Sequence, residues 1–146
     1  MADLVRSCGS AVSKDGARIA FSRFRPAKIG ATRVALVHAL AMDRTQWLDV
    51  IASAGEDFDI AALDCRGHGS SDGQAEAYSC EQFASDVESV FDEIGWRGAI
   101  VAGCSMGGCV AQMFASRHGS HGGIASNRYN DDVWAGSVVC MEAACR

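Results

Sequence analysis

GAIVAGCSMGGCVAQMFASRH, residues 98–118, places a serine between an apolar run and a helix-like run, with glycine two residues to either side. The run 98–105 is short and almost continuously apolar, as in strands covered on both faces, and the run 106–118 is expected to be a helix. Its pentapeptide 103–107, GCSMG, fits G-x-S-x-G at a strand-to-helix boundary, the pattern of a nucleophile elbow. We therefore expect a tight turn that exposes the Ser105 hydroxyl, with glycines where side chains would collide with the neighbouring strand and helix.

Predicted strands and helices alternate along the rest of the chain. An alternating pattern at 17–24, preceded by the turn signal SKDG, predicts a hairpin with residues 3–12. Two further buried strands are expected at 33–40 and 58–65, and two helices at 43–54 and 78–95, with N-caps at Asp43 and Ser79. This order predicts an α/β fold with a mostly parallel sheet flanked by helices. Ligands of such sheets bind beyond the carboxyl ends of the strands, where the loops HALAMD, RGHGSSDG and GCSMGG are expected to meet.

Composition and motifs exclude several classes of protein. A net charge of −5 argues against a nucleic-acid partner. No apolar run is long enough to span a membrane, and the first residues lack the apolar region of a secretory signal, so a cytoplasmic location is expected. The seven cysteines form no C-x-x-C pair, which gives no metal site, and most are expected to be small core residues. The glycine pattern fits neither a dinucleotide site nor a P-loop, so no cofactor is expected. A phosphate-binding turn or a turn without a ligand remain the alternatives to the elbow.

Two further motifs extend the pattern around the elbow. They are VHALAMDRTQW (37–47) and LDCRGHGSSD (63–72). With GCSMG, they make the chain resemble the α/β-hydrolase fold superfamily over about residues 17–118. The resemblance implies that Ser105 is the catalytic nucleophile and that the backbone N–H groups of Leu40 and Met106 form the oxyanion hole. It also implies that His38 is structural and that Ala39 stands where glycine is usual. Loop architecture is the role expected for Asp64, Arg66 and His68.

Within the superfamily, the chain looks most similar to ester and enol-lactone hydrolases that resemble 3-oxoadipate enol-lactonase. Serine at position 105 argues against the haloalkane dehalogenases, which carry aspartate there, whereas the cofactor-free perhydrolases stay open. We therefore expect a serine hydrolase that acts on a small-molecule ester or lactone through an acyl-enzyme. The alternative is a non-catalytic α/β fragment or interaction module. A third option makes Cys104 a redox thiol at the start of the helix, although its side chain is expected to point into the fold.

The sequence after the elbow helix departs from the family pattern, in which an acid and then a histidine follow the serine. A helix of about 12 residues is about 18 Å long, so the histidines at its far end, His118 and His121, are not expected to reach Ser105. The remaining candidates for the acid are Asp131, Asp132 and Glu142. We expect a partial hydrolase domain at 1–118 and an atypical tail at 119–146, lacking the C-terminal strands and cap. Our hypothesis for this departure is a shifted reading frame. The sheet would then end at strand 98–105, and its exposed edge would favour self-association.

Overall fold

The computed structural model describes residues 4–24, 28–73 and 78–118, together with the backbone of three short strands after residue 118. The elements in chain order are β1 (Val5–Val12), β2 (Arg18–Phe24), β3 (Thr32–Val37), the 3-10 turn η2 (Arg44–Trp47), α1 (Leu48–Ser53), β4 (Phe58–Leu63), α2 (Cys80–Ile94), β5 (Ile100–Cys104), α3 (Met106–His118), β6 (Ser126–Tyr129), β7 (Asp132–Ala135) and β8 (Val138–Met141). This is the predicted alternation of strands and helices.

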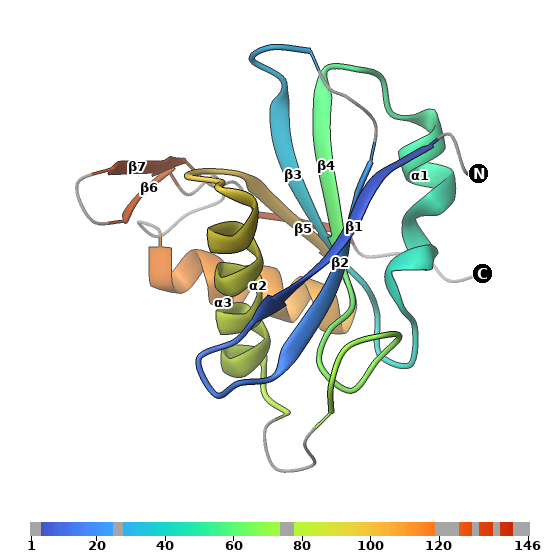
Figure 1. The fold of residues 1–146 in the computed structure, drawn as a ribbon. Coiled ribbons are helices and arrows are strands. Elements are labelled where there is room, and N and C mark those ends of the chain that lie inside the picture. The colour runs from blue at the N-terminus through green and yellow to red at the C-terminus, as the bar shows by residue number, and fades with distance from the viewer. Residues whose placement is uncertain are drawn as a thin grey trace.

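Six of these strands form one mixed sheet with the order β1-β2-β4-β3-β5-β8 (Figure 1). The predicted hairpin is present, because β1 runs antiparallel to β2, and β2 runs antiparallel to β4. The strands β4, β3 and β5 are parallel to one another, as expected from their short apolar sequences. Their carboxyl ends therefore lie at the same edge of the sheet, which brings the three predicted loops together.

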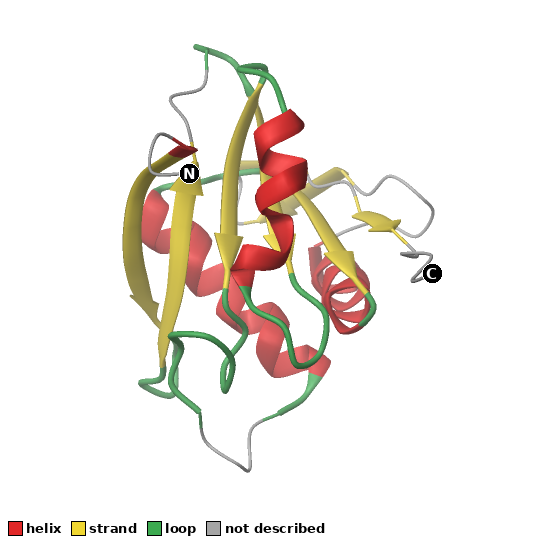
Figure 2. Ribbon diagram, turned by 90° about the vertical axis from the view of Figure 1, so that its right-hand side faces the viewer, coloured by secondary structure: helices red, strands yellow, loops and turns green. Residues whose placement is uncertain are grey.

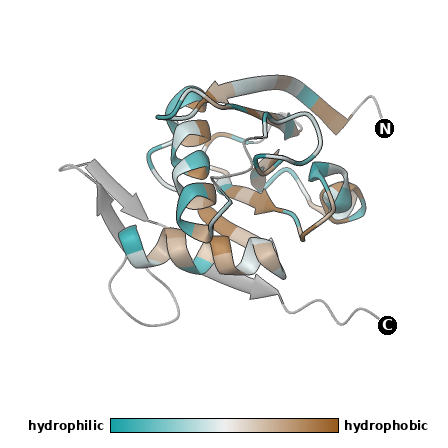
Figure 3. Cartoon of the chain, turned by 90° about the horizontal axis from the view of Figure 1, so that it is seen from below, coloured by the Kyte–Doolittle hydropathy of each residue, from teal (hydrophilic) through white to brown (hydrophobic). Residues whose placement is uncertain are grey.

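Helices cover both faces of the sheet (Figure 2). One core cluster joins the sheet to α2 and α3, and a second joins its other face to η2 and α1. α2 turns an apolar stripe toward the sheet, and Figure 3 shows alternating hydrophilic and hydrophobic bands along the helix; the buried members of the stripe are Phe83, Val87, Val90 and Phe91. In the first helical segment Trp47 and Ile51 are buried as expected, whereas Val50 is 47% exposed and is not part of the core.

Both predicted N-caps are formed. The Ser79 side chain accepts a hydrogen bond from the Gln82 N–H at 3.1 Å, which caps α2. Asp43 accepts from the Thr45 N–H at 2.8 Å, but the turn that it caps is the 3-10 turn η2 rather than the α-helix itself. α2 ends at Gly95, which caps the helix in the left-handed conformation at φ 70°.

The sheet does not end at β5, so our expectation of an unpaired edge there is wrong. Residues Val138–Met141 form β8, which pairs in parallel with β5 from Val101 to Cys104. β6 and β7 form a separate antiparallel pair. β8 is a four-residue apolar stretch, VVCM, and a run that short does not by itself distinguish a strand from a helix, which is why the tail gave no clear signal.

Candidate active site

Ser105 lies at the turn between β5 and α3, at the carboxyl edge of the parallel strands. Its side chain is exposed, and its backbone has a φ of 50°. Residues with a Cβ rarely adopt this left-handed conformation, which costs about 1–2 kcal/mol. The turn is therefore tight and strained, and it presents the serine hydroxyl to the outside of the fold as the elbow pattern predicts.

The two glycines of the pattern are required by close backbone contacts. A Cβ at Gly103 would overlap the backbone of Gly107 and lie 2.6 Å from the Gly108 nitrogen. A Cβ at Gly107 would overlap the carbonyl group of Val37 at the end of β3. These contacts press the start of α3 against both β5 and β3. The predicted collisions with helix and strand are thus present, and they fix the position of Ser105 against the loop that follows β3.

Free N–H groups face this position from the start of α3. The Ser105 carbonyl accepts from the N–H groups of Gly108 and Cys109, at 2.9 and 3.2 Å, which begins the helical ladder. The Met106 N–H comes before that ladder and donates to no acceptor within the described part of the chain. A helix N-terminus with free N–H groups favours negative charge. The Met106 N–H is therefore free to donate to a negatively charged group bound next to Ser105.

The loop after β3 holds Leu40 at an exposed tip. The Ala39 N–H donates to Gln46 Oε1 at 2.8 Å, and the Met42 N–H donates to the Ala39 carbonyl at 3.1 Å, so the loop closes on itself around Leu40. Ala41 has a φ of 61°, a second left-handed residue with a side chain. The Leu40 N–H has no acceptor among the residues described. The left-handed residue of this loop is therefore Ala41 and not Ala39, the position where the resemblance implied glycine.

His38 is a structural residue, as the resemblance implied. It is fully buried; its Nδ1 lies 2.7 Å from the Ala39 carbonyl oxygen, and its Nε2 accepts from the Cys65 N–H at 2.9 Å. Both ring nitrogens are therefore engaged with backbone. Burial lowers the pKa of His38, which keeps the imidazole neutral. His38 thus ties the loop after β3 to the loop after β4 and is not available to Ser105.

In the loop after β4, Asp64 and Arg66 make structural contacts, as expected. Buried Asp64 accepts from the backbone N–H groups of Arg44 and Ser70, at 2.8 Å each, and forms an ion pair with the Arg44 guanidinium. Buried Arg66 reaches both carboxylate oxygens of Asp86 on α2, at 2.7 and 2.8 Å. A hollow of about 410 Å³ lies between this loop and the loop after β3; it is lined by Ala41, Met42, Asp43, Thr45, Gly67, His68 and Gly69.

No described histidine forms a hydrogen bond with the Ser105 hydroxyl. His68 Nδ1 lies 3.0 Å from the Arg66 carbonyl oxygen, and His118 Nε2 lies 2.8 Å from Glu88 Oε1 at the opposite end of α3 from Ser105. His121, Asp131 and Glu142 lie outside the described residues, as does the side chain of Asp132.

The cysteines are more exposed than expected. Of the five whose side chains are described, Cys65 and Cys104 are buried, Cys80 is intermediate, and Cys8 and Cys109 are exposed. Cys104 packs in the core cluster beneath α1, so its thiol points into the fold and not toward the site.

No group of three or more His, Cys, Asp or Glu side chains in the described ranges could hold a metal ion. None of the described helices combines the length and apolar character of a membrane span.

Comparisons with known proteins agree with this geometry. A family model described as alpha/beta hydrolase fold matches residues 32–125. The dihydrolipoyllysine-residue acetyltransferase component of the acetoin cleaving system from Cupriavidus necator is 34% identical over 101 residues, which make up 69% of this chain and 26% of that protein. The chain spans about a quarter of the length of the curated relatives that it matches.

Solved structures give the same result. The structure of the bottromycin epimerase BotH in complex with bottromycin A2 is 33% identical with a TM-score of 0.68, over 75% of this chain and 44% of that chain. A thermophilic esterase from Thermogutta terrifontis is 26% identical with a TM-score of 0.67, over 76% of this chain and 41% of that chain.

Proposed function

Because the chain belongs to the alpha/beta hydrolase fold family, we propose that Ser105 is the nucleophile of an ester or lactone hydrolase. The observation that carries this proposal is the exposed serine at φ 50° between β5 and α3, held there by glycine contacts that leave no room for a Cβ. Such backbone strain persists where the surrounding structure imposes it, often at active sites. The similarity to an esterase supports an ester as the substrate class.

In the proposed reaction, the Ser105 oxygen forms a bond with the carbonyl carbon of the substrate. The carbonyl oxygen becomes an oxyanion, which the N–H groups of Leu40 and Met106 stabilise as hydrogen-bond donors. Collapse of this intermediate breaks the bond to the leaving alcohol and leaves an acyl-enzyme on Ser105. Water then attacks the acyl group and releases the acid. For a lactone the leaving alcohol stays attached to the acyl group, so a hydroxy acid is the product.

The step that the described residues do not supply is removal of the serine proton. A general base must lie within hydrogen-bond reach of the hydroxyl, and no hydrogen bond joins His38, His68 or His118 to Ser105. We therefore propose slow acylation by this chain, with acceleration of about 10³–10⁴-fold over water from the oxyanion hole and substrate binding. The expected cytoplasmic location remains a prediction.

A fluorophosphonate probe tests the assignment of Ser105. Intact-protein mass spectrometry should detect one adduct on the wild-type chain and none on Ser105→Ala. Ser116→Ala is the matched control, because Ser116 is an exposed hydroxyl on the same helix and should leave labelling unchanged. Circular dichroism of each variant checks that the fold is intact. Labelling that survives in Ser105→Ala would refute the assignment.

The second candidate function is a non-catalytic α/β module. It is favoured by one observation, the absence of a hydrogen-bonding base at the Ser105 hydroxyl among the described side chains. A folded wild-type chain that shows no labelling after prolonged incubation with the probe would support this candidate and reject the hydrolase.

A further inference from the structure

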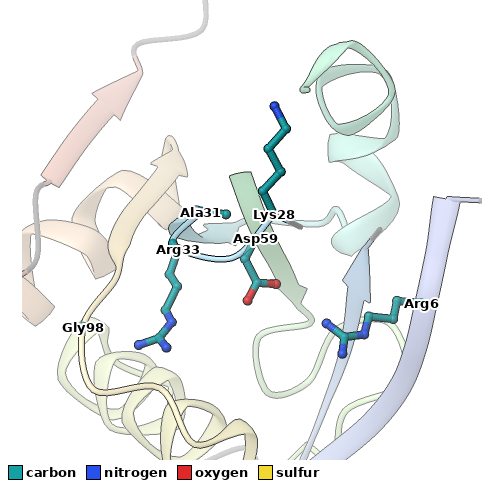
Figure 4. Close-up of a pocket in the computed structure, with 7 residues that line it drawn as sticks. Arg6, Lys28, Ala31, Arg33, Asp59 and Gly98 are labelled. Atoms are coloured by element: carbon teal, nitrogen blue, oxygen red, sulfur yellow. The ribbon is translucent and has the colours of Figure 1, made fainter. Parts of the chain in front are cut away.

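A second hollow lies at the amino ends of β3 and β4, at the edge of the sheet opposite Ser105. It has a volume of about 450 Å³, and its charged lining residues are Arg6, Lys28, Arg33 and Asp59 (Figure 4). Three cations thus share one acid, in a chain whose net charge is −5. This local excess of positive charge is independent of the elbow and of the function proposed for it.

Four charged side chains from neighbouring strands lie at this hollow or beside it. Arg33 on β3 is paired in register with Asp59 on β4. Arg23 on β2 donates to both oxygens of Asp59, at 2.8 and 3.0 Å, and both side chains are mostly buried. On β1, Ser7 is the residue paired with Arg23, and Arg6 precedes it at the point where the pairing of β1 with β2 shifts register. Arg23, Asp59 and Arg33 therefore form a row across β2, β4 and β3, and Arg6 lines the same hollow from β1.

The Asp59 carboxylate is paired with the Arg23 guanidinium. The Arg23 guanidinium is also placed over the ring of Trp96, at 5.7 Å from its centroid, which holds it beside Asp59. Lys28 has its own partner, because its Nζ lies 3.2 Å from Asp57 Oδ1. Arg6 and Arg33, in contrast, form no ion pair with a described acidic residue. Figure 4 shows their guanidinium groups on either side of the Asp59 carboxylate, at the hollow.

We propose that this hollow binds a small oxyanion with two or more negative charges, such as a phosphoryl group, between Arg6 and Arg33. The planar guanidinium donates two parallel hydrogen bonds to oxyanions, and two such groups facing one hollow match a multiply charged ligand. The Asp59 charge does not prevent binding, since Arg23 neutralises it. Gly30 and Gly98 line the same hollow without side chains, which leaves room for the ligand beside the backbone.

Titration of the full chain with inorganic phosphate, followed by two-dimensional NMR of the backbone amides, tests the proposal. Each point is matched in ionic strength with sodium chloride. We expect saturable shifts centred on Arg33 and Gly98. Arg33→Gln should weaken binding about tenfold, because it removes a bidentate charge-assisted contact. The double variant with Arg6→Gln should abolish it. Arg18→Gln is the matched control, since Arg18 is an exposed arginine paired with Asp72 away from the hollow.

Parallel titrations with sulfate and malonate identify the ligand chemistry. Tighter binding of phosphate or sulfate indicates a tetrahedral group, and tighter binding of malonate indicates a dicarboxylate; either supports an oxyanion site. The amide spectrum of each variant verifies its fold. Shifts that chloride reproduces at equal ionic strength, or binding by the double variant equal to that of the wild type, would overturn the proposal.

Discussion

Replacing Gly107 by alanine should destabilise the fold, because α3 meets the end of β3 with no room for a methyl group. The added Cβ would overlap the Val37 carbonyl oxygen and would lie 2.7 Å from the Val37 carbonyl carbon and 2.8 Å from the His38 carbonyl oxygen. Real Cβ atoms essentially never approach other atoms more closely than 3.0 Å. All three obstructing atoms belong to the backbone, so no change of rotamer can relieve the contact.

The magnitude follows from how firmly that backbone is held. Overpacking a well-packed site costs about 1–3 kcal/mol. β3 is hydrogen-bonded on one side to β4 and on the other to β5, so we expect a cost of about 3 kcal/mol. Alanine is a better helix former than glycine by about 1 kcal/mol, which offsets part of the cost. The net loss should be about 2 kcal/mol, which lowers Tm by about 6 °C in a chain of this size.

Urea unfolding monitored by circular dichroism measures this loss against a matched variant. Gly55→Ala makes the same chemical change in an exposed loop, where an added Cβ meets nothing within 4 Å. It should leave the free energy of unfolding unchanged or raise it by up to about 1 kcal/mol. Equal stabilities of Gly107→Ala and Gly55→Ala would show that α3 is not seated against β3 as described, and the assignment of the elbow would lose its support.

Three further perturbations test other parts of the fold. Ala41→Gly relieves a left-handed alanine and should raise the free energy of unfolding by about 1 kcal/mol in urea titrations; a loss would show that the loop after β3 is not strained. Asp86→Ala leaves the buried Arg66 with a single acidic partner and should cost about 3 kcal/mol by the same assay, whereas a neutral result would contradict the buried pair. Burial raises the pKa of Glu88. The hydrogen bond with His118 and the neighbouring cations lower it by a larger amount, so the pKa of Glu88 lies below its ordinary value. This pair stabilises the fold above the unfolded pKa of glutamate, and the contribution is lost as pH falls through the lower folded pKa. His118→Gln should raise the Glu88 pKa in an NMR titration, and an unchanged value would refute the coupling.

The short-range features were predictable because their signals are local. Continuous apolar runs marked β3, β4 and β5, and capping chemistry marked the start of α2 at Ser79. The elbow was predictable for a different reason: G-x-S-x-G encodes two steric requirements at fixed distances from one serine. Both requirements are present as backbone contacts of Gly103 and Gly107.

Features that depend on distant partners were not predictable. β8 joins the sheet through backbone pairing with β5, and a hydrophobic pattern does not determine the partner of a strand. The positive φ of Ala41 is imposed by the closure of its loop. An alanine residue does not by itself predict a left-handed backbone, so the sequence gives no sign of it. The charged residues around the second hollow lie on β1, β2, β3 and β4, so they are far apart in sequence and come together only in the folded sheet.

The start of α3 packs against the end of β3 through main-chain atoms on both sides, so this contact does not depend on the side chain at position 105. Since the backbone at position 105 is located without help from its own side chain, exchanging that side chain should leave its point of attachment unmoved. Cysteine, aspartate or an unnatural nucleophile introduced there would inherit the same orientation toward the helix N-terminus. At position 105 the chemical reactivity of the side chain can therefore be changed without changing the position of its backbone.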